Sequence, residues 1–228
     1  MSSTETLLSL IYGAHAGYRS LRSTIVCRHD PVLGDLARRR WAQAQRGVGE
    51  AGSSQAQPRT TPAGTEVMSW TWLVWRQQTW KWRVEKLTPD GRPEVSIVDG
   101  GRSLVWDGRS ASLFGDESSA ATLVGLDRAL VLSLDPAPIL SALLFETDGQ
   151  AACAGRVGLR AVGRPRSVSN DVLWPGADRY DLLVDQPAGI LLRAAAVLDG
   201  VEYASHEVTE IVFDEQLPDD MFALLPPG

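Results

Sequence analysis

Residues 66–85 read EVMSWTWLVWRQQTWKWRVE, and the fold prediction begins from their regular pattern. Apolar and polar side chains alternate along it with a period of two, which is typical of a β-strand with one buried face. The first half places these apolar side chains on one face: Met68, Trp70, Trp72 and Val74. The second half does the same with Trp80, Trp82 and Val84. The short link through Gln77 and Gln78 favours a hairpin, so the stretch predicts two antiparallel strands with a tryptophan-rich face.

The charged side chains of the second strand fall on its other face: Lys81, Arg83 and Glu85. A register slip of one residue would bury these charges and expose two indoles, which would cost free energy. We therefore expect Trp80, Trp82 and Val84 to face the covered side of the sheet. Trp75 has the opposite parity from Trp70 and Trp72, so we expect it to be partly exposed.

Further short strands surround this hairpin. Candidate strands are 21–27 before it and 95–98, 103–106, 110–114, 154–163, 179–185, 190–198 and 203–214 after it. Asp-Gly pairs at 99–100 and 199–200 mark tight turns between neighbouring strands. Large twisted sheets curl, so many strands with few helices predict an α+β fold built on one strongly curved antiparallel sheet.

Helical periodicity appears in three places, over residues 4–15, 31–46 and 136–145. The last of these opens at Asp135-Pro136, and its apolar residues are Ile139, Leu140, Leu143 and Leu144. We expect this helix to lie over the tryptophan face, because its apolar side chains need a surface to cover. The residues before it, 116–135, are weakly patterned.

One domain is expected over the whole chain, residues 1–228, because single β-rich domains often reach this length. Residues 47–65 read GVGEAGSSQAQPRTTPAGT, with no apolar period, and predict a flexible loop.

The formal net charge of -6 argues against nucleic acid, since proteins that neutralise phosphates are usually basic. The sequence contains no run of about 18 apolar residues, so no membrane-spanning helix is predicted. The N-terminal residues lack the basic start of an export signal, so a cytoplasmic location is expected. In that reducing compartment Cys27 and Cys153 would stay free.

No catalytic, metal or cofactor site can be assembled from the sequence, and a non-enzymatic protein is expected. There is no nucleophile elbow, phosphate loop or dinucleotide fingerprint. The histidines are His15, His29 and His206. Cys27 and His29 share a strand face, but a zinc site wants four convergent ligands. An arginine cluster on the second helix either meets anionic groups or forms a solvated helix face: Arg38, Arg39, Arg40 and Arg46.

Several ordered segments resemble the bacterial lipoprotein-carrier superfamily, which includes lipoprotein carriers, their outer-membrane receptor, mycobacterial lipoproteins and a lipid-sensing sigma-factor regulator. The matching stretches are TWKWRVEKL at 79–87, VDGGRSLVWDG at 98–108, AGRVGLRAVGRPR at 154–166, YDLLVDQPAGILLRAAAVLDG at 180–200 and VTEIVFDEQLPDDMFALLPPG at 208–228. The resemblance implies an incomplete β-barrel with helices covering an apolar concave face that can take acyl chains.

Two functions remain open at this point. In the first, a hydrophobic ligand such as a lipid or acyl chain binds in a cavity lined by Trp70, Trp72, Trp80, Trp82, Val84 and Trp106. In the second, the tryptophans fill the core and the protein is an interaction or regulatory module, with 47–65 and the preceding helix contacting a protein partner. A void of about 300 Å³ or more beside the tryptophans would favour the ligand.

Overall fold

A computed structural model describes residues 3–14, 17–48, 66–78, 80–88, 91, 93–115, 125–167 and 172–225. The helical elements are α1 (Ser3–Gly13), α2 (Pro31–Val48), α3 (Arg128–Leu134), α4 (Ile139–Ala142) and the short 3-10 helix η2 (Asp219–Phe222). The strands are β1 (Ser20–His29), β2 (Met68–Gln77), β3 (Lys81–Leu87), β4 (Pro93–Asp99), β5 (Arg102–Trp106), β6 (Ala111–Gly115), β7 (Leu143–Cys153), β8 (Arg156–Pro165), β9 (Arg179–Asp185), β10 (Leu191–Leu198) and β11 (Val201–Phe213).

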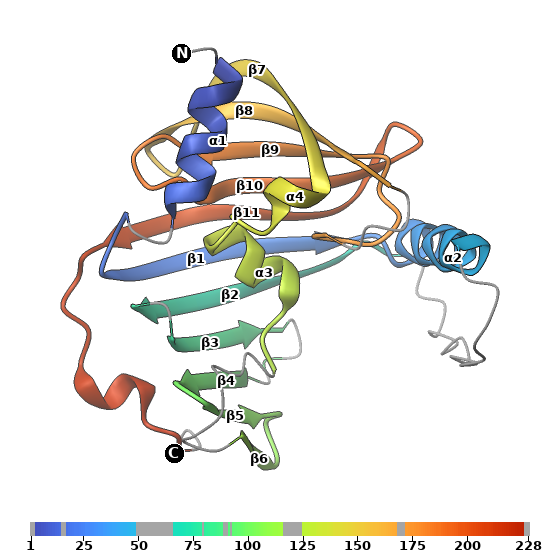
Figure 1. Ribbon diagram of the computed structural model, residues 1–228. Coiled ribbons are helices and arrows are strands. Elements are labelled where there is room, and N and C mark those ends of the chain that lie inside the picture. The colour runs from blue at the N-terminus through green and yellow to red at the C-terminus, as the bar shows by residue number, and fades with distance from the viewer. Residues whose placement is uncertain are drawn as a thin grey trace.

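All 11 strands form one antiparallel sheet in the order β6-β5-β4-β3-β2-β1-β11-β10-β9-β8-β7. The first strand, β1, therefore lies in the middle, paired with β2 on one side and with the last strand on the other. The sheet is strongly curved and does not close, because β6 and β7 end it as separate edges (Figure 1). The predicted α+β half-barrel is confirmed.

Helices cover the concave face, as expected, but the helix that packs with the tryptophans is α3 and not the predicted helix 136–145. Figure 1 shows α1, α3 and α4 in front of the sheet, whereas α2 projects from its side. α3 arises within the weakly patterned segment, and its N-cap is Asp127, whose side chain accepts a hydrogen bond from the backbone N–H of Leu130.

The predicted helix over 136–145 is wrong. Only α4 is helical there, and from Leu143 the chain enters β7 and pairs with β8. The apolar residues of this segment have helical spacing, but the segment is too short for that spacing to fix the element. Pairing with β8 on both sides of an irregularity between Thr147 and Gln150 makes this segment a strand, so tertiary context overrides local propensity here.

The inner face of the β1–β4 half is filled by interlocking side chains. The tryptophan and valine side chains of β2 and β3 pack against α3 through Leu130 and Leu134. In the other half, Leu7 and Ile11 of α1 pack over Tyr180. α1 and α3 thus bury their apolar sides against the curved sheet, and such packing is the main source of stability for short helices.

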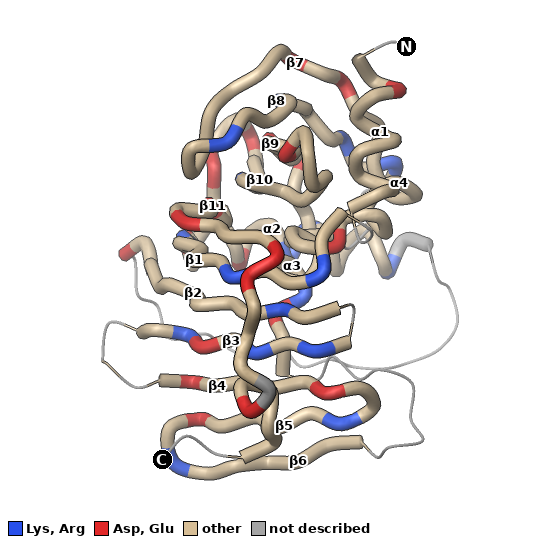
Figure 2. Tube along the Cα trace, turned by 90° about the vertical axis from the view of Figure 1, so that its left-hand side faces the viewer, with Lys and Arg blue, Asp and Glu red and all other residues tan. Residues whose placement is uncertain are grey.

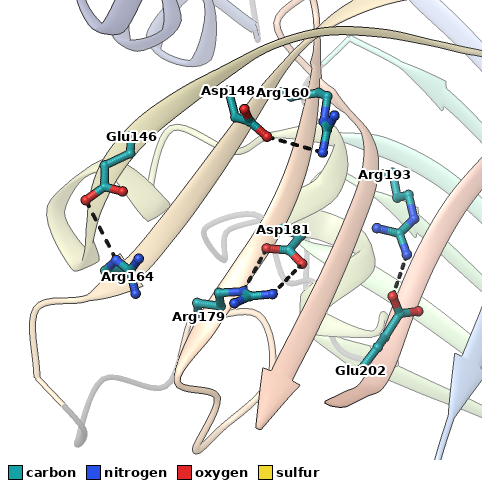
Figure 3. A network of polar contacts seen from close by, with 8 residues as sticks. All are labelled: Glu146, Asp148, Arg160, Arg164, Arg179, Asp181, Arg193 and Glu202. Atoms are coloured by element: carbon teal, nitrogen blue, oxygen red, sulfur yellow. Dashed lines mark hydrogen bonds and ion pairs between the residues drawn. The ribbon is translucent and has the colours of Figure 1, made fainter. Parts of the chain in front are cut away.

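The outer face has two different coverings. The C-terminal segment with η2 crosses the outer side of β3 and β4, where Phe222 and Leu217 pack with Ile97 (Figure 2). Over β7 to β11 the outer face instead carries exposed ion pairs, shown in Figure 3, such as Arg160 with Asp148. Within the part of the chain described, no helix is long and apolar enough to cross a membrane.

Candidate functional site

The six residues predicted to line a cavity do not come together. Trp72, Trp82 and Val84 are buried on the inner face, and Trp70 is half-buried beside them. Trp80 is a correction: it is 44% exposed. β3 begins only at Lys81, so Trp80 belongs to the turn before it. The alternation of buried and exposed side chains along the strand therefore does not apply to Trp80.

Trp106 is a second correction, because it lies on the opposite face of the sheet. It is paired with Val95, and both belong to the outer cluster under the C-terminal segment. Trp75 lies in the same cluster and is half-buried, as its parity predicted. The face on which a β5 residue lies depends on the register of β3 with β4 and of β4 with β5. The sequence alone does not fix these two registers.

A groove is present on the inner face, beside the buried tryptophans. Its volume is about 330 Å³, and it lies between β2 to β4 and the residues leading into α3. Its apolar lining is Trp72, Val84 and Leu126. Its polar lining is Lys86, Glu94, Ser96, Gly125 and Asp127. Of the six predicted residues, only Trp72 and Val84 line it.

One wall of the groove is set by Gly125. Its carbonyl accepts a hydrogen bond of 2.9 Å from the Ser96 hydroxyl. The residue has a φ of +84°, and a Cβ there would lie 2.2 Å from a methyl carbon of Val105. Only glycine meets both constraints without strain, so the entry to α3 is held close against β4 and β5.

The rim of the groove is charged. Lys86 Nζ lies 3.2 Å from Glu94 Oε2 and 5.5 Å from the ring centre of Trp70, an arrangement that combines an ion pair with a cation–π contact. Asp127 stands at the start of α3, where desolvation raises the pKa of its carboxyl despite backbone hydrogen bonds that lower it. The Trp70 Nε1–H is buried and has no hydrogen-bond partner among the described residues.

A row of aromatic rings runs away from the groove across the inner face. The ring centres of Trp70 and Trp72 are 6.0 Å apart, those of Trp72 and His206 are 5.0 Å apart, and His206 is 4.7 Å from Trp174. Burial lowers the pKa of His206 to about 3, so this imidazole is neutral at physiological pH. The sequence did not single out His206; its place follows from a register that pairs it with Cys27, which in turn pairs with Trp70.

A buried arginine, Arg76, completes the inner face. It follows Trp72 and Val74 in the same alternation, yet only 1% of its surface is exposed. Its guanidinium donates to the Tyr18 hydroxyl at 2.6 Å and to the Leu134 carbonyl at 2.9 Å. The parity of β2 was the available signal, but an arginine at a strand end is ordinarily read as solvated.

The other residues considered from the sequence are the possible metal ligands, the arginine cluster, the loop and the cysteines. Among the residues described, no group of three or more histidine, cysteine or acidic side chains could hold a metal. In the arginine cluster, Arg39 pairs with Asp35 and Arg40 pairs with Asp178. His15 and residues 49–65 of the predicted loop lie outside the described residues. Both cysteines are free.

No family model matches the sequence, and no curated protein does. Solved structures are similar in fold. A chain of the MucA/MucB complex of Pseudomonas aeruginosa matches with a TM-score of 0.53 and 14% identity, over 97% of this chain and 60% of that chain. This chain thus spans less than two thirds of that relative.

An uncharacterized conserved protein from Thermus thermophilus matches with a TM-score of 0.54 and 11% identity, over 99% of this chain and 95% of that one. The lipoprotein LppX of Mycobacterium tuberculosis gives a TM-score of 0.49 at 13% identity, over 95% and 99% of the two chains. At these identities the likeness concerns fold alone. The chain thus shares the fold of the first two of these structures, and in this chain that fold is an open half-barrel of antiparallel strands with helices on its concave face.

Proposed function

We propose that this protein is a non-enzymatic binding protein that holds the apolar part of a small hydrophobic molecule, a lipid or an acyl chain, in the groove over Trp72 and Val84. The observation that carries the proposal is the groove itself. It lies on the inner face of the sheet beside Trp72 and has a volume of about 330 Å³. Ligand pockets usually measure ~300–1,000 Å³, so this groove suits a single short chain rather than a large lipid.

The ligand would lie along the sheet rather than inside it. Trp82 and Val84 are packed against Leu130 and Leu134 of α3, so the space beneath that helix is already filled. Burial of each 100 Å² of apolar ligand surface contributes about 2.5 kcal/mol, and this is the force expected to hold the chain. The charged rim would then fix the orientation of the polar end.

Native mass spectrometry after exposure to a lipid extract tests this proposal. The unmodified protein should retain a bound molecule, and Val84→Trp, which fills the groove, should lose it. Trp80→Ala is the matched control, because Trp80 is exposed outside the groove and its loss should leave the adduct intact. Glu94→Trp at the exposed rim is a second blocking variant that disturbs the core less. Failure of the unmodified protein to retain any lipid would rule the function out.

A second candidate is a protein-interaction module. A similar fold occurs in a chain of the MucA/MucB complex, and strand β6 is an open edge with Leu113 60% exposed and Phe114 41% exposed. An extended polypeptide can add to such an edge through backbone hydrogen bonds. If this is the function, Leu113→Lys should abolish capture of the partner in a pull-down while leaving lipid retention unchanged.

A further inference from the structure

We propose that the groove selects amphiphiles whose polar end carries a positive charge, such as a long-chain ammonium or trimethylammonium, over neutral and anionic molecules with the same tail. This inference rests on the proposed function and specifies the chemistry of its ligand. Its basis is the balance of charges in the groove lining and the aromatic rings beside them.

The charged lining contains one base and two acids: Lys86, Glu94 and Asp127. Lys86 and Glu94 neutralise each other, since their charged atoms are 3.2 Å apart. The Asp127 side chain accepts a backbone hydrogen bond from Leu130 at 3.1 Å, and no ion pair to it occurs among the residues described. Lys86 also acts electrostatically on Asp127, so the one base and two acids together leave the lining with a net charge of -1 beside an apolar floor.

The aromatic side chains favour the same sign of charge. Lys86 Nζ already lies 5.5 Å from the ring centre of Trp70, so a cation is accommodated at this end of the groove. Trp72 provides an indole in the lining itself, and its ring centre lies 6.0 Å from that of Trp70. The negative face of an indole attracts ammonium groups, and quaternary ammonium headgroups are bound by aromatic side chains in this way.

An anionic headgroup would meet the opposite conditions. To reach Lys86 it would have to displace Glu94 and approach Asp127 as well, and two like charges would then be held within one groove. Desolvation already raises the pKa of Asp127, which means that its carboxylate gains from a nearby cation and loses from a nearby anion.

Three probes with one dodecyl tail separate these cases: dodecyltrimethylammonium, dodecanol and dodecanoate, each titrated below its micelle concentration by calorimetry and tryptophan fluorescence. The cation should bind about tenfold tighter than the alcohol, and the carboxylate should bind weakest. If none of the three binds, the proposed function fails. If all bind equally, or the carboxylate binds best, the function stands and the inference of cation selection is overturned.

Variants locate the preference. Asp127→Asn removes the charge but keeps a side chain that caps helices as well as aspartate does, so α3 should persist while the tenfold preference disappears. Glu94→Gln should lower the affinity for the cationic probe by a similar factor. Asp99→Asn is the matched control, because Asp99 pairs with Lys81 away from the groove. A preference that survives both groove variants, or is lost equally in the control, would refute the inference.

Discussion

Arg76 and Trp82 are direct cross-strand partners on β2 and β3, and the guanidinium carbon of Arg76 lies 4.7 Å from the centre of the Trp82 ring. The same guanidinium is hydrogen-bonded to Tyr18, before β1, and to Leu134, at the end of α3. One buried cation thus joins the sheet, the segment after α1 and the helix that covers the tryptophans. It stabilises the wall on which the groove depends.

Replacement of this arginine should therefore be costly. Arg76→Met keeps much of the apolar stem but removes the donor to the Tyr18 hydroxyl, leaves the Leu134 carbonyl with Tyr18 alone as its side-chain donor, and takes the cation away from Asp135. We therefore expect the free energy of unfolding to fall by about 3 kcal/mol. Urea unfolding followed by tryptophan fluorescence measures this. Arg160→Met is the control, because that arginine is in an exposed pair with Asp148 and its loss should cost less than about 1 kcal/mol. Equal effects of the two variants would contradict the role given to Arg76.

The docking of α1 depends on Gly189, which follows β9 in a tight turn. Gly189 and Gly200 both have positive φ, +70° and +83°. A Cβ at Gly189 would lie 2.0 Å from the Leu10 carbonyl oxygen of α1, whereas one at Gly200 would meet nothing. Gly200→Ala should thus cost only the backbone strain, about 1 kcal/mol, and Gly189→Ala should cost about 2 kcal/mol more by displacing the helix. Thermal unfolding of the pair measures the difference, and equal melting temperatures would show that α1 does not pack here.

Most of the sheet could be predicted because its strands alternate cleanly. In β3, Trp82 and Val84 are buried and Arg83 and Glu85 face outward, as their parity required. Trp80 was misplaced because alternation says nothing about where a strand begins. The same local pattern could not exclude a helix at Leu143, where pairing with β8 settles the matter.

The site was predicted less well than the fold, because it is made by contacts distant in sequence. Trp72 and Val84 belong to the most regular strands and were found. Gly125 and Asp127 come from a weakly patterned segment, and they join the groove only when α3 folds back over the sheet. No local period marks residues whose role is to close a space between two elements.

Asp185 is the buried acid whose loss should be most damaging. Its side chain is fully buried and accepts two hydrogen bonds from Arg156, of 2.6 and 2.9 Å, and one from the backbone of Ala188. Asp185→Asn should lower the free energy of unfolding by about 2–3 kcal/mol, since Arg156 then loses its charged partner. Asp181→Asn is the matched control in the exposed pair with Arg179, and chemical denaturation should place its cost below about 1 kcal/mol (Figure 3). A smaller loss for Asp185 than for Asp181 would be inconsistent with this network.

The buried imidazole of His206 gives the fold a specific acid sensitivity. Its pKa falls from 6.5 to about 3 on folding because burial between two indoles disfavours the charged form. The unfolded chain therefore binds a proton below pH 6.5 that the folded chain does not bind until about pH 3. The contribution of this group to stability is complete above pH 6.5 and is lost progressively as the pH falls between these values, by about 1.4 kcal/mol per pH unit.

The unfolding free energy at about pH 7.5 and about pH 5 measures this effect. His206→Phe keeps an aromatic ring between Trp72 and Trp174 without a titrating group, so the unmodified protein should lose about 2 kcal/mol more than the variant over this interval. His29, whose pKa is also lowered by burial, acts in the same direction but is present in both proteins and cancels in the comparison. Cys27, opposite His206 on β1, has a raised pKa and stays neutral throughout. Parallel pH profiles would mean that His206 reaches solvent in the folded protein, and that the aromatic row behind the groove is looser than its ring distances indicate.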